Sequence, residues 1–296
     1  MAGTYDSEGR VANLSQESTF VLNGMFALSA RFSNSEYFSR VKPTDRGVAF
    51  AKRAQTLFEQ QQDLDEQPTL RMMQGCILLA CYYLTSGISS QAWILTGVCV
   101  RMAYELGLHD MDHNIIVENR KQTPQEWVIG EEKRRAWWSA WELDNFASTI
   151  SDRPYCFDRN RAEVLLPVSD NAWFSNTPVA SAALSTDPLT AWKSLDGCPN
   201  QDERAWFLVS VYLVRLGTEL FHLPKGASSQ MHKDHDTAIS CFALVLPSKF
   251  DISGGISFDG ENWKSSSWII STHLMIQGSV SIYVTCVIFS GFAICN

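Results

Sequence analysis

The chain has 296 residues, of which 45% are hydrophobic and 19% charged, a balance typical of globular proteins. This composition excludes wholesale disorder, collagen-like repeats and coiled-coil rods. The formal net charge of −8 disfavours direct binding to nucleic acid, because neutralising phosphates requires clustered lysine and arginine. Eight cysteines occur without C-x-x-C or zinc-finger spacing, so we expect buried free thiols in a reducing, intracellular compartment.

The sequence of the N-terminal half predicts helices. The apolar stretch 20–32 predicts a short buried helix, the polar stretch 33–46 a loop, and apolar spacing from Gly47 a second helix. Between Arg71 and Arg101, 29 residues carry no charge. A turn signal at 85–87 divides this run, and each half is too short to span a bilayer. We therefore expect two buried helices that form a hairpin.

The C-terminal half adds three more predicted helices. The first begins with Thr123-Pro124, carries the apolar stripe Ala136, Ala140, Leu143, Ala147 and Ile150, and ends at Arg153-Pro154. Residues 151–200 hold five of the ten prolines and predict a long irregular loop layer. Helical patterns return at 202–221 and, more weakly, at 234–246. No convincing strand pattern is present, so we predict an all-α fold.

The ends of the chain differ from its body. We divide the sequence into a polar segment 1–18, a multi-helix domain 19–277 and an apolar tail 278–296. For the tail, a buried terminal helix or strand is favoured over a membrane anchor, because no basic flank supports an anchor. A third interpretation is that the tail results from a gene model that reads through an intron.

No motif predicts catalysis. The sequence contains no G-x-S-x-G elbow in a suitable context, no P-loop and no G-x-G-x-x-G. His109 and His113 flank two aspartates, but they follow the end of a helix, and a solvated loop is favoured over a metal site. The charged run 131–135 is interpreted as the first turn of a helix, with its charges on the solvated side. We therefore expect no catalytic residues, no metal ligands and no enzyme.

One ordered set of residues resembles a known family. The set comprises Trp93, Gly97, Arg101, Gly107, His109, Arg134, Arg135, Trp137, Trp138, Asp144, Arg153 and Pro154. Together with the segment 23–33, it resembles the fungal-specific transcription factor domain, the middle homology region of Zn(II)2Cys6 binuclear zinc cluster regulators. The resemblance extends over about residues 20–277. Asp152 stands where the family commonly has glycine beside Arg-Pro, so we expect an altered turn there.

The resemblance implies an all-α, non-catalytic regulatory domain in the nucleus, possessing protein partners such as a DNA-binding transcription factor or a second copy of itself. In that family a six-cysteine module holds two zinc ions and reads DNA, and no stretch of this sequence has its spacing. We therefore expect no cofactor in this chain, no DNA-binding residues, DNA contact only through an upstream zinc cluster, and no membrane partner. We expect either a truncated relative or a gene model that reads through an intron, and a link to a secondary-metabolite gene cluster follows from family habit.

The expected burial of charged side chains indicates a specific contact between residues of the motif set. Arg101, Arg153 and Asp144 are expected at the edges of buried helices, where unpaired charges are costly. We predict that Asp144 pairs with Arg101 or Arg153 and locks the helix hairpin to the helix that follows. The alternative is a pocket in which these residues and nearby tryptophans sense a small effector, whose binding residues stay unknown. Other open alternatives are a tail-anchored membrane protein, a gene fragment without function and, least favoured, an all-α enzyme.

Overall fold

The structure is a computed structural model that describes residues 14–61, 67–87, 89–118, 120, 122–223, 226–260 and 262–294, with side chains up to Ser279. Within these ranges the regular structure is helical, apart from one isolated antiparallel bridge between Leu165 and Ala183. The prediction of an all-α fold is therefore confirmed. The chain forms two compact units: unit 1 comprises 1–108 and 139–157, and unit 2 comprises 109–138 and 158–296.

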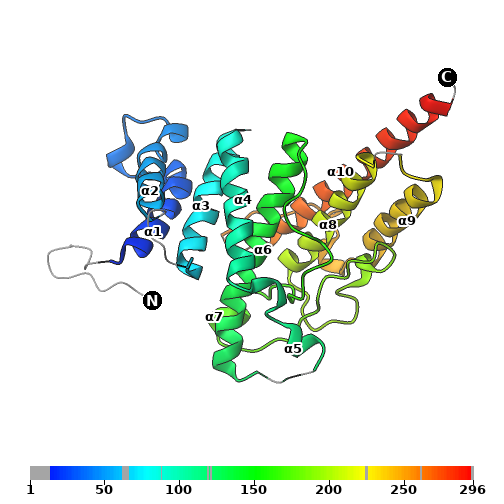
Figure 1. The fold of residues 1–296 in the computed structure, drawn as a ribbon, viewed down its shortest axis with the longest axis horizontal. Coiled ribbons are helices and arrows are strands. Elements are labelled where there is room, and N and C mark those ends of the chain that lie inside the picture. Colours follow the sequence, from blue (N-terminus) through cyan, green and yellow to red (C-terminus); the bar gives the residue numbers. More distant parts are fainter. Residues whose placement is uncertain are drawn as a thin grey trace. The chain divides into compact units, whose positions relative to one another are not determined.

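Unit 1 is built from α1 (Gln16–Ser29), α2 (Val48–Gln61), α3 (Leu70–Ser86), α4 (Ser90–Glu105) and the second half of α6 (Pro124–Ser151), with the short 3-10 helices η1 (Ala30–Phe32), η2 (Glu36–Phe38) and η3 (Pro43–Asp45). Helices α1, α2 and α3 pack on one another, and α3 packs on α4 (Figure 1). Side-chain oxygens of Ser15, Thr69 and Ser89 cap the starts of α1, α3 and α4. The predicted hairpin and the predicted helix after Gly47 are both confirmed.

The first helix is amphipathic rather than fully buried. Phe20 and Ala27 on α1 are buried, whereas Met25 and Phe26 are 49% and 48% exposed. The prediction of a helix within 20–32 is confirmed. The prediction that this helix is buried was wrong for the face that carries Met25 and Phe26. The apolar residues on that face cover the outside of unit 1 instead of its core.

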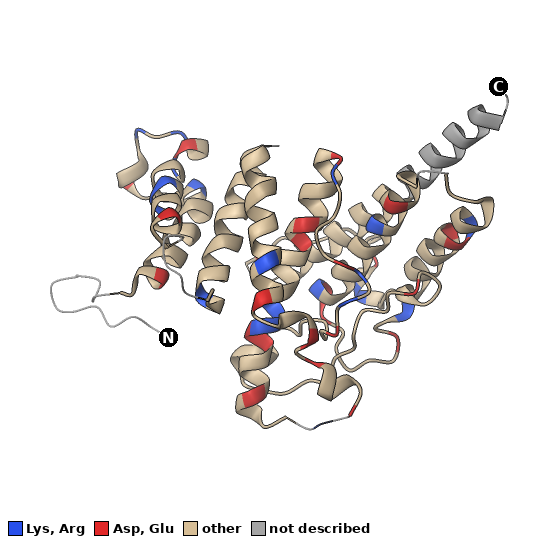
Figure 2. Cartoon of the chain, viewed as in Figure 1, with Lys and Arg blue, Asp and Glu red and all other residues tan. Residues whose placement is uncertain are grey.

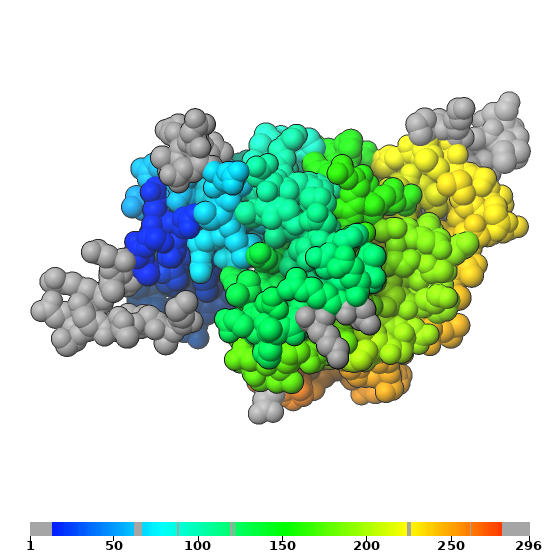
Figure 3. Space-filling model, turned by 60° about the horizontal axis from the view of Figure 1, so that its bottom comes forward, coloured from blue at the N-terminus to red at the C-terminus, as the bar shows by residue number. Residues whose placement is uncertain are grey.

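Unit 2 is built around α8. Its elements are η4 (Leu108–Asp110), α5 (His113–Ile116), the first half of α6, α7 (Asp170–Phe174), η5 (Ala191–Lys193), α8 (Glu203–Phe221), α9 (Ser229–Val245), η6 (Ser248–Phe250) and α10 (Trp263–Ile294). Helix α8 is buried over most of its length and packs against α10 and α9. Figure 3 shows the yellow atoms of α9 beside yellow-green atoms of the preceding segments. The predicted helices at 202–221 and 234–246 are both present, although α9 begins earlier, at Ser229.

The predicted loop layer is confirmed and is well ordered. Between Asp152 and Asp202 the chain contains only α7, η5 and the isolated bridge, yet Val164, Leu166 and Leu195 are buried. Side chains satisfy backbone groups that no helix supplies. For example, the Asn200 side-chain amide donates to the Pro167 carbonyl and to Ser181 Oγ, both at 2.9 Å.

The cysteines and the tail test two further predictions. Cys76 and Cys99 are buried thiols, and burial raises the pKa of Cys76 to about 12. Cys156 is exposed, so burial was wrongly predicted for that residue. The start of the tail, at 278 and 279, lies on α10, and the side chains beyond it lie outside the described residues. No helix in the described residues has the length and apolar character needed to cross a membrane.

Two glycines in buried helices of unit 1 provide a test of this packing. A Cβ atom at Gly75 on α3 would lie 2.3 Å from the Phe20 ring, whereas a Cβ atom at Gly97 on α4 would meet nothing within 4 Å. We expect Gly75→Ala to destabilise the protein by about 1–3 kcal/mol through overpacking. Gly97→Ala should instead stabilise it by up to about 1 kcal/mol, because alanine favours the helix. Denaturant unfolding of both variants checks this, and equal effects of the two would contradict the close α1–α3 contact.

Candidate regulatory site

Five of the motif residues lie on α6, whose start follows from its sequence; they are Arg134, Arg135, Trp137, Trp138 and Asp144. Thr123 Oγ1 accepts the Glu126 N–H, and the Glu126 carboxylate accepts the Thr123 N–H at 2.9 Å, which forms a reciprocal capping box. The bonds that the carboxylate accepts from the Thr123 N–H and hydroxyl lower the pKa of Glu126. The apolar stripe of the predicted helix is buried at Ala136, Ala140, Leu143 and Ala147, whereas Ile150 is 50% exposed. The helix contributes to both units, so each unit's part is described separately.

In unit 2, α6 carries one half of a buried ion pair. Arg134 donates from Nε and Nη2 to the two carboxylate oxygens of Asp112, at 2.8 and 2.7 Å. The two side chains are only 2% and 0% exposed. Asp112 also accepts the Leu165 N–H at 2.8 Å. Burial alone would lower the pKa of Arg134, but its contacts with Asp112 and Glu131 raise it, so the guanidinium stays charged.

A second carboxylate extends this pair into a network. Glu131 is buried, accepts Arg135 Nε at 3.1 Å and the Val168 N–H at 3.0 Å, and lies 3.5 Å from Arg134 Nη1. Burial raises the pKa of Glu131. Arg135 reaches outward to Asp170 at 2.6 Å and lies over the Trp173 ring, 4.5 Å from its centroid. We name Asp112, Glu131, Arg134, Arg135 and Asp170 the charge network; in Figure 2 charged segments of both colours meet on this part of α6.

The interpretation of 131–135 as a solvated first turn was wrong. The helix begins at Pro124, and Glu131 and Arg134 are buried. One signal in the sequence could have found this arrangement. Glu131, Arg134 and Arg135 precede Trp138 by seven, four and three residues, and helical spacing places all four near one face. Trp138 is buried, and its indole N–H donates to the Leu165 carbonyl at 2.8 Å, beside the contacts of Asp112.

The other motif residues near this region lie at a helix end, in a backbone contact and in the core. Gly107 has φ +64°, a conformation that favours glycine, and it ends α4 in unit 1. In unit 2 the His109 carbonyl accepts the Glu163 N–H at 2.6 Å, and the Glu163 side chain contacts His113. Trp137 is fully buried. No group of three or more potential ligands could hold a metal ion in the part of the chain that the structure describes.

In unit 1 the end of α6 holds a second buried carboxylate. Asp144 accepts the N–H groups of Cys156 and Phe157, at 2.9 and 3.0 Å, and Ser148 bonds both Asp144 and the Pro154 carbonyl. We call Asp144, Ser148, Pro154, Cys156 and Phe157 the Asp144 cluster. After burial, Asp144 is the main cause that raises the pKa of the Cys156 thiol, to about 11.

The two arginines predicted as partners of Asp144, Arg101 and Arg153, differ from each other in their surroundings. The Arg153 guanidinium lies over the Trp93 ring, 4.8 Å from its centroid. Arg101 acts on the Cys156 thiol and lowers its pKa, opposite to the effect of Asp144. The backbone N–H groups of 156 and 157 were not anticipated as partners, because they become neighbours of Asp144 only through the turn after α6. Asp152 has φ +55°, which is the left-handed conformation that glycine adopts readily.

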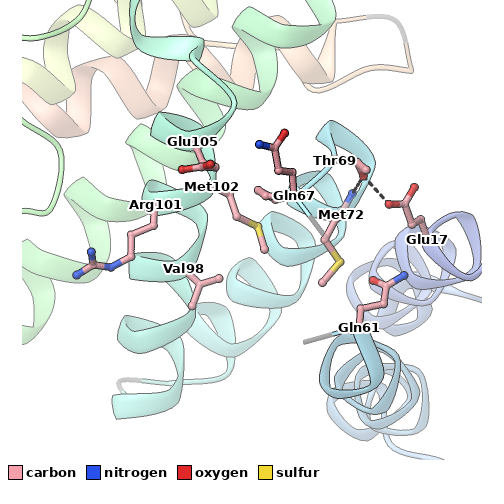
Figure 4. Close-up of a pocket in the computed structure, with 10 residues that line it drawn as sticks. Glu17, Gln61, Gln67, Thr69, Met72, Val98, Arg101, Met102 and Glu105 are labelled. Carbon is pink, nitrogen blue, oxygen red and sulfur yellow. Dashed lines mark hydrogen bonds between the residues drawn. The ribbon is translucent and has the colours of Figure 1, made fainter. Parts of the chain in front are cut away.

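A cavity of about 570 Å³ in unit 1 includes one motif residue. Met72 and Met102 lie on its wall, and Glu17 accepts a hydrogen bond from Thr69 at its edge (Figure 4). Arg101 belongs to the lining, but in Figure 4 its guanidinium points away from the two methionines. None of the tryptophans belongs to the lining, so this cavity differs from the tryptophan-walled effector pocket considered from the sequence.

Comparison with known families decides the identity of this fold. A family model described as "Fungal specific transcription factor domain" matches residues 5–246, which include parts of both units. The chain belongs to this family. The fungal transcription factor domain thus contains the charge network and the Asp144 cluster, and the resemblance stated from the sequence is confirmed. No solved structure matches the chain.

Curated relatives of the domain are fungal transcription factors. The chain is 26% identical over 160 residues to the Zn(2)-C6 fungal-type transcription factor FTF1c of Fusarium oxysporum f. sp. lycopersici, covering 53% of this chain and 17% of the relative. It is 29% identical over 131 residues to the tropolone cluster transcription factor tropK of Talaromyces stipitatus, covering 42% and 23%. It is 25% identical over 118 residues to the transcription factor tazR of Aspergillus terreus, covering 40% and 18%. The matched part spans about a fifth of these relatives' lengths.

The buried pair in the charge network provides the second prediction. Asp112→Asn removes the charge that compensates Arg134, and we expect a loss of about 3–5 kcal/mol in the free energy of unfolding. Asp110→Asn is the matched control in the same loop, because its side chain is 62% exposed, and it should change stability by less than about 0.5 kcal/mol. Urea unfolding measures both. A stable Asp112→Asn variant would show that the pair does not hold this part of unit 2.

The partner of Asp144 is the subject of the third prediction. A double-mutant cycle that combines Asp144→Ala with Arg101→Ala should give a coupling energy of about 1 kcal/mol or more, whereas the cycle with Arg153→Ala should give a smaller one. The reason is that Arg101 and Asp144 both act on the Cys156 thiol, while Arg153 stacks on Trp93. Thermal and urea unfolding of the four variants in each cycle measure the coupling. A larger coupling with Arg153 would reverse the assignment.

Proposed function

We propose that this chain is a regulatory, non-catalytic domain of a fungal transcription regulator and that it acts in the nucleus through contacts with proteins. The match of the family model over residues 5–246 carries the proposal. The structure is compatible with it, because motif residues such as Arg134 and Asp144 are buried and hold the loop layer to the helices. In the described part of the chain, these clusters contain no group of ligands suited to a metal.

DNA recognition is proposed to belong to a different module. We propose that a six-cysteine cluster holding two zinc ions reads DNA, either upstream of this domain or on a partner protein. Two sequence features support this division. The chain has a formal net charge of −8, and its cysteines lack the spacing of such a cluster. The partner would be a DNA-binding transcription factor or a second copy of this protein.

The regulated genes are proposed to belong to a secondary-metabolite cluster. The support is the similarity to the tropolone cluster transcription factor of Talaromyces stipitatus, at 29% identity. The proposed mechanism is a helical domain whose surfaces restrain or expose groups that contact the transcription machinery. A ligand that binds one conformation more tightly would shift that balance.

The proposal predicts an effect on transcription that depends on the fold. The full chain, fused to an unrelated DNA-binding domain, should change the transcription of a reporter gene in a fungal host relative to that DNA-binding domain alone. Asp112→Asn should abolish the change, because it destabilises unit 2, and Asp110→Asn should preserve it. Reporter mRNA is the readout. An unchanged reporter, with the fusion present in the nucleus at equal amount, would contradict the proposed role.

A further inference from the structure

A basic and aromatic surface lies in unit 1 on the segment that joins α1 to α2. Residues 31–53 contain six cations and two acids, a local excess of four positive charges in a chain whose formal net charge is −8. The cations are Arg31, Arg40, Lys42, Arg46, Lys52 and Arg53. Figure 2 shows blue positions on the connection between α1 and α2 and on α2 itself. The local charge is therefore opposite to that of the whole molecule.

Aromatic rings form a continuous row within the same segment. The Phe26 and Phe50 ring centroids are 5.3 Å apart, those of Phe50 and Phe38 are 6.5 Å apart, and those of Phe38 and Tyr37 are 4.9 Å apart. The row begins at a half-exposed ring on α1 and ends at Tyr37, which is 81% exposed. Phe32, which is 79% exposed, adds a further aromatic side chain to the segment. Apolar rings gathered in this way on a surface are typical of interaction sites.

The surface is held in a defined shape. Arg46 Nη1 donates to the Ser33 carbonyl at 2.7 Å and Nε donates to the Val41 carbonyl at 3.1 Å, so one side chain joins both ends of the loop between η1 and η3. The guanidinium also lies 5.8 Å from the centroid of the Phe38 ring. A Cβ atom at Gly47 would lie 2.1 Å from the Ala27 carbonyl oxygen, so α1 and the start of α2 approach closely. A preformed surface loses little entropy when it binds.

The outer cations of this surface lack acidic partners among the described residues. Arg40, Lys42, Lys52 and Arg53 are exposed, and none of them forms an ion pair with any residue that the structure describes. By contrast, each cation of the charge network contacts a carboxylate. Unpaired cations beside exposed rings present hydrogen-bond donors and positive potential to a partner.

We propose that this surface, defined by Phe26, Phe32, Tyr37, Lys42, Lys52 and Arg53, docks an acidic peptide segment of a partner protein that carries apolar side chains. Carboxylates of the peptide would meet the cations, and its apolar side chains would cover the aromatic row. A short peptide experiences mainly the local potential, because charges more than about 10 Å away are screened at physiological salt. A nucleic acid strand would extend over the acidic remainder of the chain, so the net charge favours a peptide.

This inference deepens the proposed function, since it names a partner for a domain proposed to act through proteins. The test uses the full chain and a fluorescent peptide that repeats the sequence Asp-Asp-Phe-Asp-Leu, with binding followed by anisotropy. We expect binding that weakens as salt rises. A control peptide with serine in place of Phe and Leu should bind about tenfold or more weakly, and one with lysine in place of Asp should not bind.

Matched variants separate the surface from the overall charge. The triple variant Lys42→Glu, Lys52→Glu, Arg53→Glu should lose about tenfold or more in affinity. The control triple Lys133→Glu, Lys193→Glu, Lys233→Glu changes the net charge equally at exposed sites in unit 2 and should retain the affinity. Tyr37→Ala should weaken binding at an unchanged melting temperature, because its ring is mostly exposed. An equal loss in both triple variants would overturn the proposal.

Three further results would overturn it. The first is that no acidic peptide binding is measured for the folded wild-type chain. The second is that a single-stranded DNA oligonucleotide binds more tightly than the peptide and loses affinity in the first triple variant. The third is that light scattering shows a dimer of the wild-type chain that the same variant dissociates. The reporter assay distinguishes failure of this proposal from failure of the proposed function. A reporter effect without peptide binding contradicts only the proposed docking surface. Peptide binding without a reporter effect contradicts only the proposed function.

Discussion

The ion pair between Asp112 and Arg134 is the contact on which the order of unit 2 depends. Both side chains are essentially inaccessible to solvent, so their charges have lost their hydration, and each must be compensated within the protein. The bidentate geometry and the Leu165 N–H supply that compensation. The pair thereby joins three segments that are far apart in sequence: the short segment after α4, helix α6 and the beginning of the loop layer. Without it, the Leu165 N–H would lose its acceptor, and Asp112 would lose its contact with α6.

Buried carboxylates have the same role in both units. Asp112 and Glu131 in unit 2 accept the backbone N–H groups of Leu165 and Val168, and Asp144 in unit 1 accepts those of Cys156 and Phe157. Each of these N–H groups belongs to a segment without regular structure. A buried backbone donor must find an acceptor, and where no helix or sheet provides one, a side chain has to do so. This explains how some fifty residues of loop layer are ordered, and why the family motif is rich in charged residues although no chemistry is expected of them.

Charges in this domain fall into two classes with different physical roles. Within the charge network, Asp112, Glu131 and Arg134 are buried and paired, and their removal affects stability, because a lone charge is then left in a medium of low polarity. Those of the segment 31–53 are mostly exposed and lie beside exposed rings, so their replacement is expected to affect binding more than folding. The two classes are not distinguished by residue type: Arg134 and Arg53 are the same side chain in opposite environments. The tertiary structure alone assigns each to its class.

The sequence by itself determined the helices, since their signals are local. Apolar spacing, the helix start at Thr123-Pro124 and the turn at 85–87 act over a few residues and were read correctly. The order of motif residues also sufficed to indicate the family. The burial of Arg134, the partners of Asp144 and the exposed face of α1 could not be obtained in this way. Each depends on which distant segment covers a given helix face: Asp112 is 22 residues from Arg134, and only folding brings them together. Local patterns determine which residues form a helix, and long-range packing decides which of their charges face solvent and which must be paired.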